Sequence, residues 1–255
     1  MTRGLKWILS LTFTLVFCAS GVAVASGSAG ALFTEGNALY RQGAFEEAVV
    51  RYQAALATGL RNPDLYFNLG NAQFKRGALG EALLNYERAL RLSPDDPDIV
   101  ENIAFANVSK VDRFDLDPPN AATRFVLAFY HWFSPNGLSV WVSLTFLIAC
   151  VGAGGLLLSA SRRMQWMVLL VSGLLGCGVG SALLATKAGD LNTPAAIVLA
   201  AETIGRSGPG DDFLQVFTLH EGTKVVLERN EGPWGLVRLP NGIGGWIVLG
   251  AIGMI

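Results

Sequence analysis

Two long stretches of the chain carry no charged residue, and they constrain the fold more than any other feature. Residues 138–160 are uncharged over 23 positions and residues 166–186 over 21. A helix needs about 20 apolar residues to cross the hydrocarbon core of a bilayer. A soluble core helix of this length would show a polar face, and neither stretch does. The sequence therefore predicts two transmembrane helices, 138–160 and 166–186.

The short connection between these stretches predicts their orientation. Arg162 and Arg163 lie within residues 161–165, and short loops rich in Lys and Arg stay in the cytoplasm. We therefore expect a two-pass protein of the inner (cytoplasmic) membrane. The segments before and after the hairpin then lie on the periplasmic, extracytoplasmic side.

The N-terminus agrees with this orientation. Arg3 and Lys6 precede an apolar run, residues 7–24, that ends in small residues. A basic start, an apolar centre and a small-residue cleavage point are the three parts of a secretory signal peptide. We expect residues 1–25 to be a signal peptide, with an uncleaved anchor as the alternative.

Small residues within the hairpin suggest a packing seam. Ser172, Gly176 and Gly180 recur every four residues, a stripe that lets a neighbouring helix approach closely. Packing within the chain, dimerisation and no packing role all fit this pattern. Cys150 and Cys177 fall at similar depth, and we interpret them as small apolar side chains, with a redox pair as the alternative.

The first half of the chain contains an internal repeat. Five small or aromatic residues recur 34 positions later, and Asn62-Pro63-Asp64 returns as Asp96-Pro97-Asp98. Each of these triplets places an acceptor at a helix N-cap and a proline at the first helical position. The small residues predict close packing of paired helices, with the tyrosines filling space toward the next unit. The matched pairs are Gly36 and Gly70, Gly43 and Gly77, Ala48 and Ala82, Tyr52 and Tyr86, and Ala55 and Ala89.

This period and residue order resemble the tetratricopeptide repeat. The resemblance implies an α-helical segment over residues 28–110, with two repeats and a capping helix. Two repeats are fewer than the three or so that such a stack usually needs. We therefore expect another surface to complete the stack, either a partner protein or the membrane-proximal segment.

In that family the first helix of each repeat lines a concave face that binds extended peptides or helices. Asparagine amides can bind a peptide backbone at two points, and basic side chains can receive carboxylates. The alternative is that some of these side chains only cap or bridge helices. The candidate groove residues are Asn37, Tyr40, Arg41, Asn68, Asn71, Phe74, Lys75 and Asn102.

Residues 111–135 connect the repeats to the hairpin. A Pro-containing linker, residues 115–120, precedes the aromatic-rich segment 125–133, which is too short to span a bilayer. Its aromatic residues predict an interfacial helix in contact with membrane lipid.

Residues 192–255 change to short β-branched runs separated by Gly and Pro. So many strands in about sixty residues are expected to close into a small barrel, because closure buries a core and removes open edges. The expected strands are 197–203, 213–219, 223–228, 234–239 and 245–249.

Three motifs in this segment resemble a bacterial SH3-like domain: Arg-Ser-Gly-Pro at 206–209, His-Glu-Gly-Thr-Lys-Val at 220–225 and Gly-Trp-Ile at 245–247. The resemblance implies binding of peptidoglycan or peptides. Arg206, Trp234 and Trp246 are the candidate surface residues. Alternatively, the two tryptophans mainly fill the core.

Composition argues against catalysis and nucleic-acid binding. The net charge of −1 provides no basic field for nucleic acid. Two histidines and three cysteines leave little material for a metal site, and no nucleophile motif has its partners. We therefore expect a non-enzymatic protein without metal or cofactor.

The fold class is thus multi-domain: a tetratricopeptide repeat segment, a two-helix transmembrane hairpin and a small all-β SH3-like barrel. This order, with the segment at residues 96–113, resembles the E-type proteins of the bacterial Bat (aerotolerance) operon. The resemblance implies von Willebrand-type Bat proteins as partners, an AAA-type ATPase system and a role in stress tolerance. We expect a membrane-anchored scaffold for protein partners, with a peptidoglycan-binding tether or sensor as the alternative.

Overall fold

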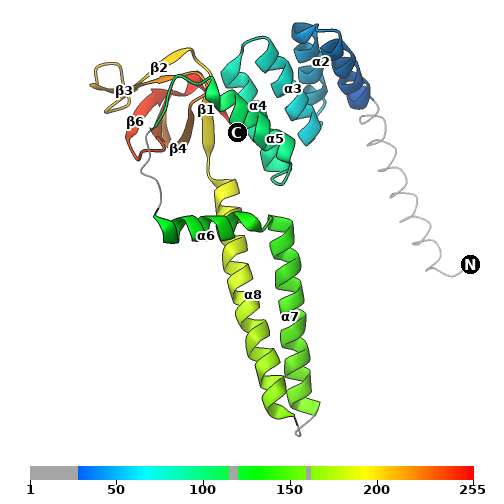
Figure 1. The fold of residues 1–255 in the computed structure, drawn as a ribbon. Coiled ribbons are helices and arrows are strands. Elements are labelled where there is room, and N and C mark those ends of the chain that lie inside the picture. Colours follow the sequence, from blue (N-terminus) through cyan, green and yellow to red (C-terminus); the bar gives the residue numbers. More distant parts are fainter. Residues whose placement is uncertain (1–27, 115–119, 159–161) are drawn as a thin grey trace, which may run out of the picture. The chain divides into compact units, whose positions relative to one another are not determined.

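The computed structural model describes residues 28–114, 120–158 and 162–255. The predicted signal peptide, residues 1–25, lies outside the described residues. The chain forms two compact units (Figure 1). One unit joins the segment that ends at Phe114 with Pro194–Ile255, and the other is the intervening segment Asp115–Thr193.

The first part of the discontinuous unit is a stack of helices, two of which begin where the sequence predicted. The Asn62 side chain accepts from the Asp64 N–H at 2.7 Å, and the Asp96 side chain accepts from the Asp98 N–H at 3.0 Å. These acceptors satisfy donors that a helix start leaves free. The helices are residues 28–41, α2 (Phe45–Ala57), α3 (Pro63–Lys75), α4 (Leu79–Leu92) and α5 (Pro97–Val108).

The repeated glycines make room for the repeated tyrosines. A Cβ on Gly36 would lie 2.6 Å from the Tyr52 ring, and one on Gly70 would lie 2.7 Å from the Tyr86 ring. Each tyrosine therefore packs on the glycine of its own repeat, and it also shares a core cluster with residues of the next unit, as predicted. The repeated alanines of α2 and α4 are fully buried, as their small size indicated.

The second part of the same unit is an antiparallel sheet in the order β3-β2-β6-β5-β4-β1-β7. Within residues 194–255, all of which are described, the two end strands β3 and β7 do not pair, so the hydrogen-bonded sheet is not the closed barrel that was predicted. The strands are β1 (Ala195–Val198), β2 (Glu202–Arg206), β3 (Gln215–His220), β4 (Lys224–Glu231), β5 (Trp234–Arg238), β6 (Gly244–Val248) and β7 (Ile252–Met254).

The predicted strand 197–203 is in fact two strands. β1 pairs with β4 and β7, whereas β2 pairs with β3 and β6. The chain must leave one part of the sheet before it enters the other, so the ladder breaks between Val198 and Glu202. The short strand β7 lay outside the predicted set.

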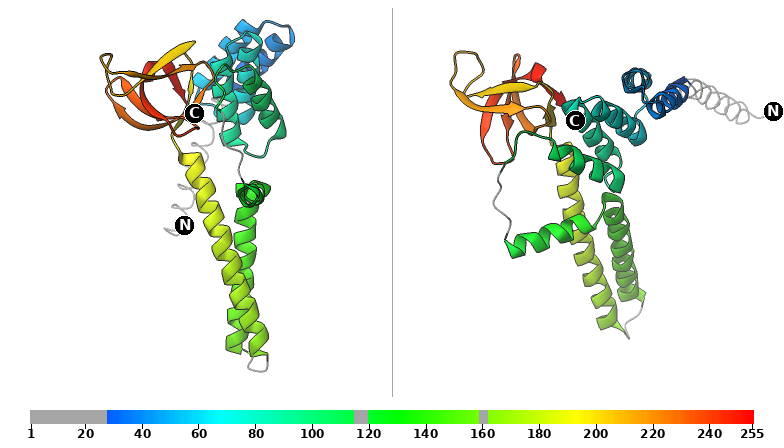
Figure 2. Two further views of the ribbon diagram at one scale, coloured as in Figure 1. Left: turned by 60° about the vertical axis from the view of Figure 1, so that its left-hand side comes forward. Right: turned by 45° about the horizontal axis from the view of Figure 1, so that its top comes forward.

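The sheet packs directly against the repeat helices (Figure 2). Leu83 and Leu84 of α4 share a hydrophobic cluster with Ile197, Leu199 and Ile255. The C-terminal sheet therefore covers one face of α4 in the second repeat. The sequence had pointed instead to a partner or to the membrane-proximal segment.

The intervening unit consists of α6 (Ala121–Trp132), α7 (Pro135–Leu158) and α8 (Arg163–Asn192). Residues Pro135–Leu158 and Arg163–Gly189 form helices that are long and apolar enough to cross a membrane, each with a mean hydropathy of 2.1. The predicted interfacial segment is helical, and the Asn120 side chain caps α6 by accepting from the Thr123 N–H at 2.8 Å.

Glycines bring α7 and α8 close together. A Cβ on Gly173 would lie 2.5 Å from the Ala149 backbone nitrogen, and Gly176 and Gly180 also face α7. Ser172 is exposed, so within the chain Gly173 rather than Ser172 contacts α7. The seam serves packing within the chain, and Cys150 and Cys177 are both free thiols.

Candidate functional site

The asparagines of the candidate groove form a hydrogen-bond ladder that repeats with the sequence. Asn37 Oδ1 accepts from the Tyr52 hydroxyl at 2.8 Å and from Asn68 Nδ2 at 3.0 Å. The ladder thus links the helix over residues 28–41 to both α2 and α3. The equivalent ladder, 34 residues later, joins Asn71 Oδ1 to the Tyr86 hydroxyl and to Asn102 Nδ2, both at 2.8 Å.

The tyrosines of this ladder remain neutral donors. Burial raises the pKa of the Tyr52 phenol to about 12 and also raises the pKa of the Tyr86 phenol. The asparagines therefore do bridge helices, as the alternative interpretation held. Asn37 and Asn68 each use only one of the two polar atoms of the side-chain amide in this ladder. Among the described residues, Asn37 Nδ2 and Asn68 Oδ1 have no hydrogen-bond partner. Contact between these free atoms and a peptide remains a prediction.

The other groove candidates lie near the ends of the same helices. Arg41 and Lys75 are exposed and form no ion pair with any residue that the structure describes. The Phe74 ring packs against the Phe105 ring of α5, with centroids 5.5 Å apart, while Tyr40 is half-buried. Arg41 and Lys75 are therefore accessible at the ends of their helices, and contact of these side chains with a partner stays a prediction.

A single carboxylate joins the repeats to the sheet. Asp112 Oδ2 accepts from the His220 backbone N–H at 2.7 Å and from the Thr223 hydroxyl at 2.5 Å. Asp112 Oδ1 lies 2.7 Å from His220 Nδ1. Burial raises the pKa of the Asp112 carboxyl, but these hydrogen bonds outweigh burial and hold the pKa below its ordinary value. Asp112 therefore remains ionised at neutral pH.

Helix α4 receives its N-terminal cap from the sheet. Its N-cap residue, Ala78, has no side chain that can accept, and Glu221 Oε1 instead accepts from the Gly80 N–H at 2.7 Å. A carboxylate at this position also interacts favourably with the helix dipole. Lys224 adds an ion pair to Glu87 of α4 at 2.7 Å.

Two glycines allow this close contact. Gly222 has φ +86° and turns the chain between β3 and β4, and a Cβ on it would lie 2.9 Å from Leu83. A Cβ on Gly80 would lie 2.7 Å from the Val198 carbonyl oxygen. At Gly80 a larger residue would meet the β1 backbone and push the turn away from α4, whereas at Gly222 the positive φ would strain any side chain.

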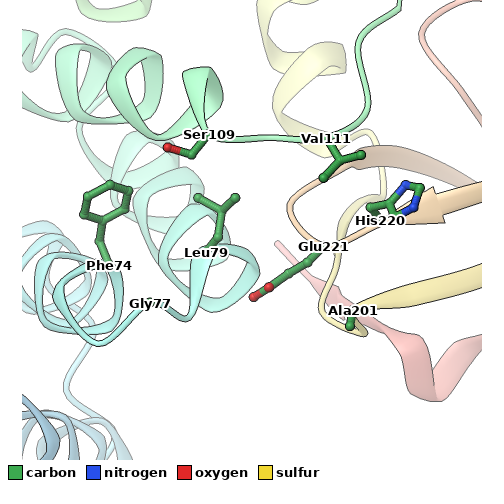
Figure 3. A pocket seen from close by; sticks show the side chains of 8 residues that line it. All are labelled: Phe74, Gly77, Leu79, Ser109, Val111, Ala201, His220 and Glu221. Carbon is green, nitrogen blue, oxygen red and sulfur yellow. The ribbon is translucent and has the colours of Figure 1, made fainter.

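A pocket of about 410 Å³ lies where the repeats meet the sheet (Figure 3). Phe74, Leu79 and Ser109 line it from the helices, and Val111, Ala201, His220 and Glu221 line it from the connecting segment and the sheet. Only Phe74 among these residues was a candidate from the sequence. The 96–113 and 220–225 motifs were both noted, but nothing in either indicated that they contact each other.

The three residues suggested by the SH3-like resemblance have different environments in the structure. Trp246 is buried with 5 % exposure, and the Arg229 guanidinium lies 5.0 Å from its ring centroid, so Trp246 belongs to the core. Trp234 is half-buried and lines a shallow hollow of about 300 Å³ together with Arg206. Arg206 also lies 3.6 Å from Asp211 on the same hollow.

The described residues contain no group of three His, Cys, Asp or Glu side chains arranged to hold a metal ion. Asp112 and His220 form a carboxylate–imidazole pair, but the contacts described for both join the repeats to the sheet.

The comparison with protein families agrees with the repeat assignment. The tetratricopeptide repeat family model matches residues 33–97. Among solved structures, the first such domain of Spaghetti (RPAP3), bound to an HSP90 peptide, is 22 % identical. That match covers 33 % of this chain and 94 % of the other, with a TM-score of 0.20. No curated protein matches the chain. The repeats define a protein–protein interaction scaffold.

Proposed function

We propose that this protein is a membrane-anchored scaffold that holds a protein partner in its repeat groove on the extracytoplasmic side. The family match of residues 33–97 supports the scaffold class. Within the part of the chain that the structure describes, the asparagine ladder leaves amide atoms free and Arg41 and Lys75 form no ion pair, and both features support the groove as the contact surface.

The unit that contains both the repeats and the sheet supports the membrane topology in this proposal. The chain leaves the unit at Phe114, passes through two helices that can each span a membrane, and returns to the same unit at Pro194. Because the repeats and the sheet share a core, both must lie on one side of the bilayer. Two crossings meet this requirement, whereas one crossing does not. Arg162 and Arg163 in the connection favour the extracytoplasmic side for that unit.

The finer assignment rests on resemblance. The motifs at 206–209, 220–225 and 245–247 favour an SH3-like relationship for the sheet, and the domain order favours a subunit of a Bat-type envelope complex. In such a complex the partners are von Willebrand-type Bat proteins and the physiological role is stress tolerance.

Cysteine labelling tests the topology in the full chain. With Cys18, Cys150 and Cys177 replaced by alanine, single cysteines are placed at Arg61 and Asn241 of the soluble unit and at Gln165 beside the helix connection. A membrane-impermeant maleimide should label the first two in intact spheroplasts and Gln165→Cys only after permeabilisation. Labelling of positions 61 and 241 from opposite sides would contradict the proposal.

Charge reversal tests the groove. We expect the Arg41→Glu, Lys75→Glu variant to recover less of its partner after crosslinking in native membranes, as quantified by mass spectrometry. The matched control is Arg61→Glu, which reverses an exposed cation outside the candidate groove. Equal recovery with all three proteins would rule out these cations as partner contacts.

The second candidate function is a cell-wall tether, and the hollow beside Trp234 favours it. Arg206, Asp211 and Trp234 together offer a cation, a carboxylate and an aromatic ring at one site. Cosedimentation of the detergent-solubilised full chain with purified peptidoglycan tests this function. Binding that Trp234→Ala and Arg206→Ala both abolish would support a tether, and no binding would leave only the scaffold.

A further inference from the structure

The pocket between the repeats and the sheet has two chemically different sides. On the helical side, the exposed apolar surface extends beyond the pocket, because Phe105 is 65 % exposed and Val108 is 71 % exposed. Val111, which lines the pocket, is 67 % exposed. Large apolar side chains gathered at one exposed site are typical of an interaction surface.

The other side of the pocket provides hydrogen-bond acceptors. Glu221 lines the pocket and extends its carboxylate toward the start of α4 (Figure 3), where Oε1 accepts from the Gly80 N–H. Among the described residues, no hydrogen bond uses Glu221 Oε2. His220 has its Nδ1 beside Asp112, so in the neutral ring that donates to Asp112 the other nitrogen, Nε2, is an acceptor. The lining residues include a carboxylate but neither lysine nor arginine.

The groove candidates and the pocket carry charges of opposite sign. Arg41 and Lys75, which form no ion pair with the described residues, lie at the ends of the first helices of the two repeats, whereas the pocket that Phe74 lines carries Glu221. An occupant that satisfies both regions places a cation near the sheet and a carboxylate toward the repeats. This arrangement would also set the direction in which the occupant lies.

We propose that this composite pocket binds a cationic, apolar segment of the protein partner. An aromatic or branched side chain packs against Phe74, Phe105 and Val111, and a neighbouring lysine or arginine pairs with Glu221. The proposal rests on the scaffold function above and specifies its partner. In this proposal the sheet also contributes to partner recognition, because Glu221, which pairs with the cation, lies in the turn that follows β3.

A random-peptide selection tests this inference with the full chain in nanodiscs of zwitterionic lipid. The probe is a display library of peptides about twelve residues long, and empty nanodiscs remove peptides that bind lipid. The expected consensus is an aromatic or branched residue within about four positions of a lysine or arginine, the spacing of neighbours on one helix face.

Two variants test the charged side and the apolar side of the pocket separately. Glu221→Gln retains an oxygen that can accept from Gly80 but removes the charge, so it should bind the selected peptides about tenfold more weakly. Phe105→Ser should weaken all of them, while the matched control Glu47→Gln, at an exposed carboxylate on α2, should not. Circular dichroism confirms that each variant is folded.

The outcomes distinguish this inference from the scaffold function. Enriched peptides that are acidic, or that bind Glu221→Gln as tightly as the wild type, would overturn the composite pocket. If such peptides still depended on Arg41 and Lys75, the scaffold function would stand. A selection that enriches no peptide would also overturn the inference. The crosslinking experiment with the Arg41→Glu, Lys75→Glu variant would then test the scaffold function separately.

Discussion

Asp112 is held by three hydrogen-bonding groups from a turn more than a hundred positions away in the sequence. Asp112→Ala would leave the His220 N–H and the Thr223 hydroxyl without their acceptor. We expect a loss of about 1–3 kcal/mol in the free energy of unfolding, measured by urea denaturation in detergent. Asp95→Ala, at an exposed turn position, should change little, and an equal loss in both would argue against a specific role for Asp112.

The lowered pKa of Asp112 predicts a pH dependence of stability. Because the folded pKa lies below the ordinary value of 3.8, the ionised carboxylate contributes stability at pH values above that value. This contribution decreases as the pH falls through the folded pKa. The stability difference between the wild type and Asp112→Asn should therefore be largest near neutrality and shrink in acid. A difference that grows below pH 3.8 would contradict the assignment.

At the scale of elements, equivalent positions in the two repeats differ where α4 meets the sheet. Val50 of α2 is 58 % exposed, whereas its counterpart Leu84 is 6 % exposed. Glu46 is an exposed charge, whereas its counterpart Gly80 lies against the backbone of β1. The repeat pattern is thus preserved on the faces that helices share and lost on the face that the sheet covers.

Gly80→Ala tests this docking. Its methyl group would meet the Val198 carbonyl oxygen at 2.7 Å, and backbone atoms cannot move aside cheaply. We expect a destabilisation of about 1–3 kcal/mol by chemical denaturation, despite the higher helix propensity of alanine. The matched control is Gly30→Ala in the first helix, where nothing lies within 4 Å. Stabilisation by both substitutions would show that the sheet does not constrain α4.

The pair α7 and α8 offers a similar comparison. A methyl group at Gly173 would meet backbone atoms of Ala149, whereas one at Gly178 would meet nothing within 4 Å. Gly173→Ala should therefore lower the thermal unfolding midpoint of the detergent-solubilised chain, by an amount that corresponds to about 1–3 kcal/mol. Gly178→Ala should not, and equal midpoints would argue against this helix contact.

At the scale of the whole molecule, the discontinuous unit makes the repeats depend on the C-terminus. Without residues 194–255, the apolar side chains of Leu83 and Leu84 lose their cover, and α4 loses the Glu221 cap. We expect residues 28–114 alone to unfold at a lower urea concentration than the full chain, as measured by circular dichroism. Equal midpoints would show that the two repeats and their capping helix are independently stable.

Local chemistry explains which predictions the structure confirmed. The starts of α3 and α5 follow from a capping side chain and a proline within three residues, and the repeat period follows from packing between neighbouring helices. The hairpin helices follow from their length and composition. The closed barrel was wrong because strand number does not determine which edges pair, and the four-residue stripe did not identify Gly173 because it does not specify the facing helix.

The repeats, the starts of α3 and α5 and the two apolar helices could be read from the residues alone, because each depends on interactions between residues close in the chain or one repeat apart. The contact of Asp112 with His220, the capping of α4 by Glu221 and the pocket between the repeats and the sheet became visible only in the folded chain. These residues are separated by the whole hairpin, and their contact depends on the shapes of two surfaces, a property that no local pattern encodes.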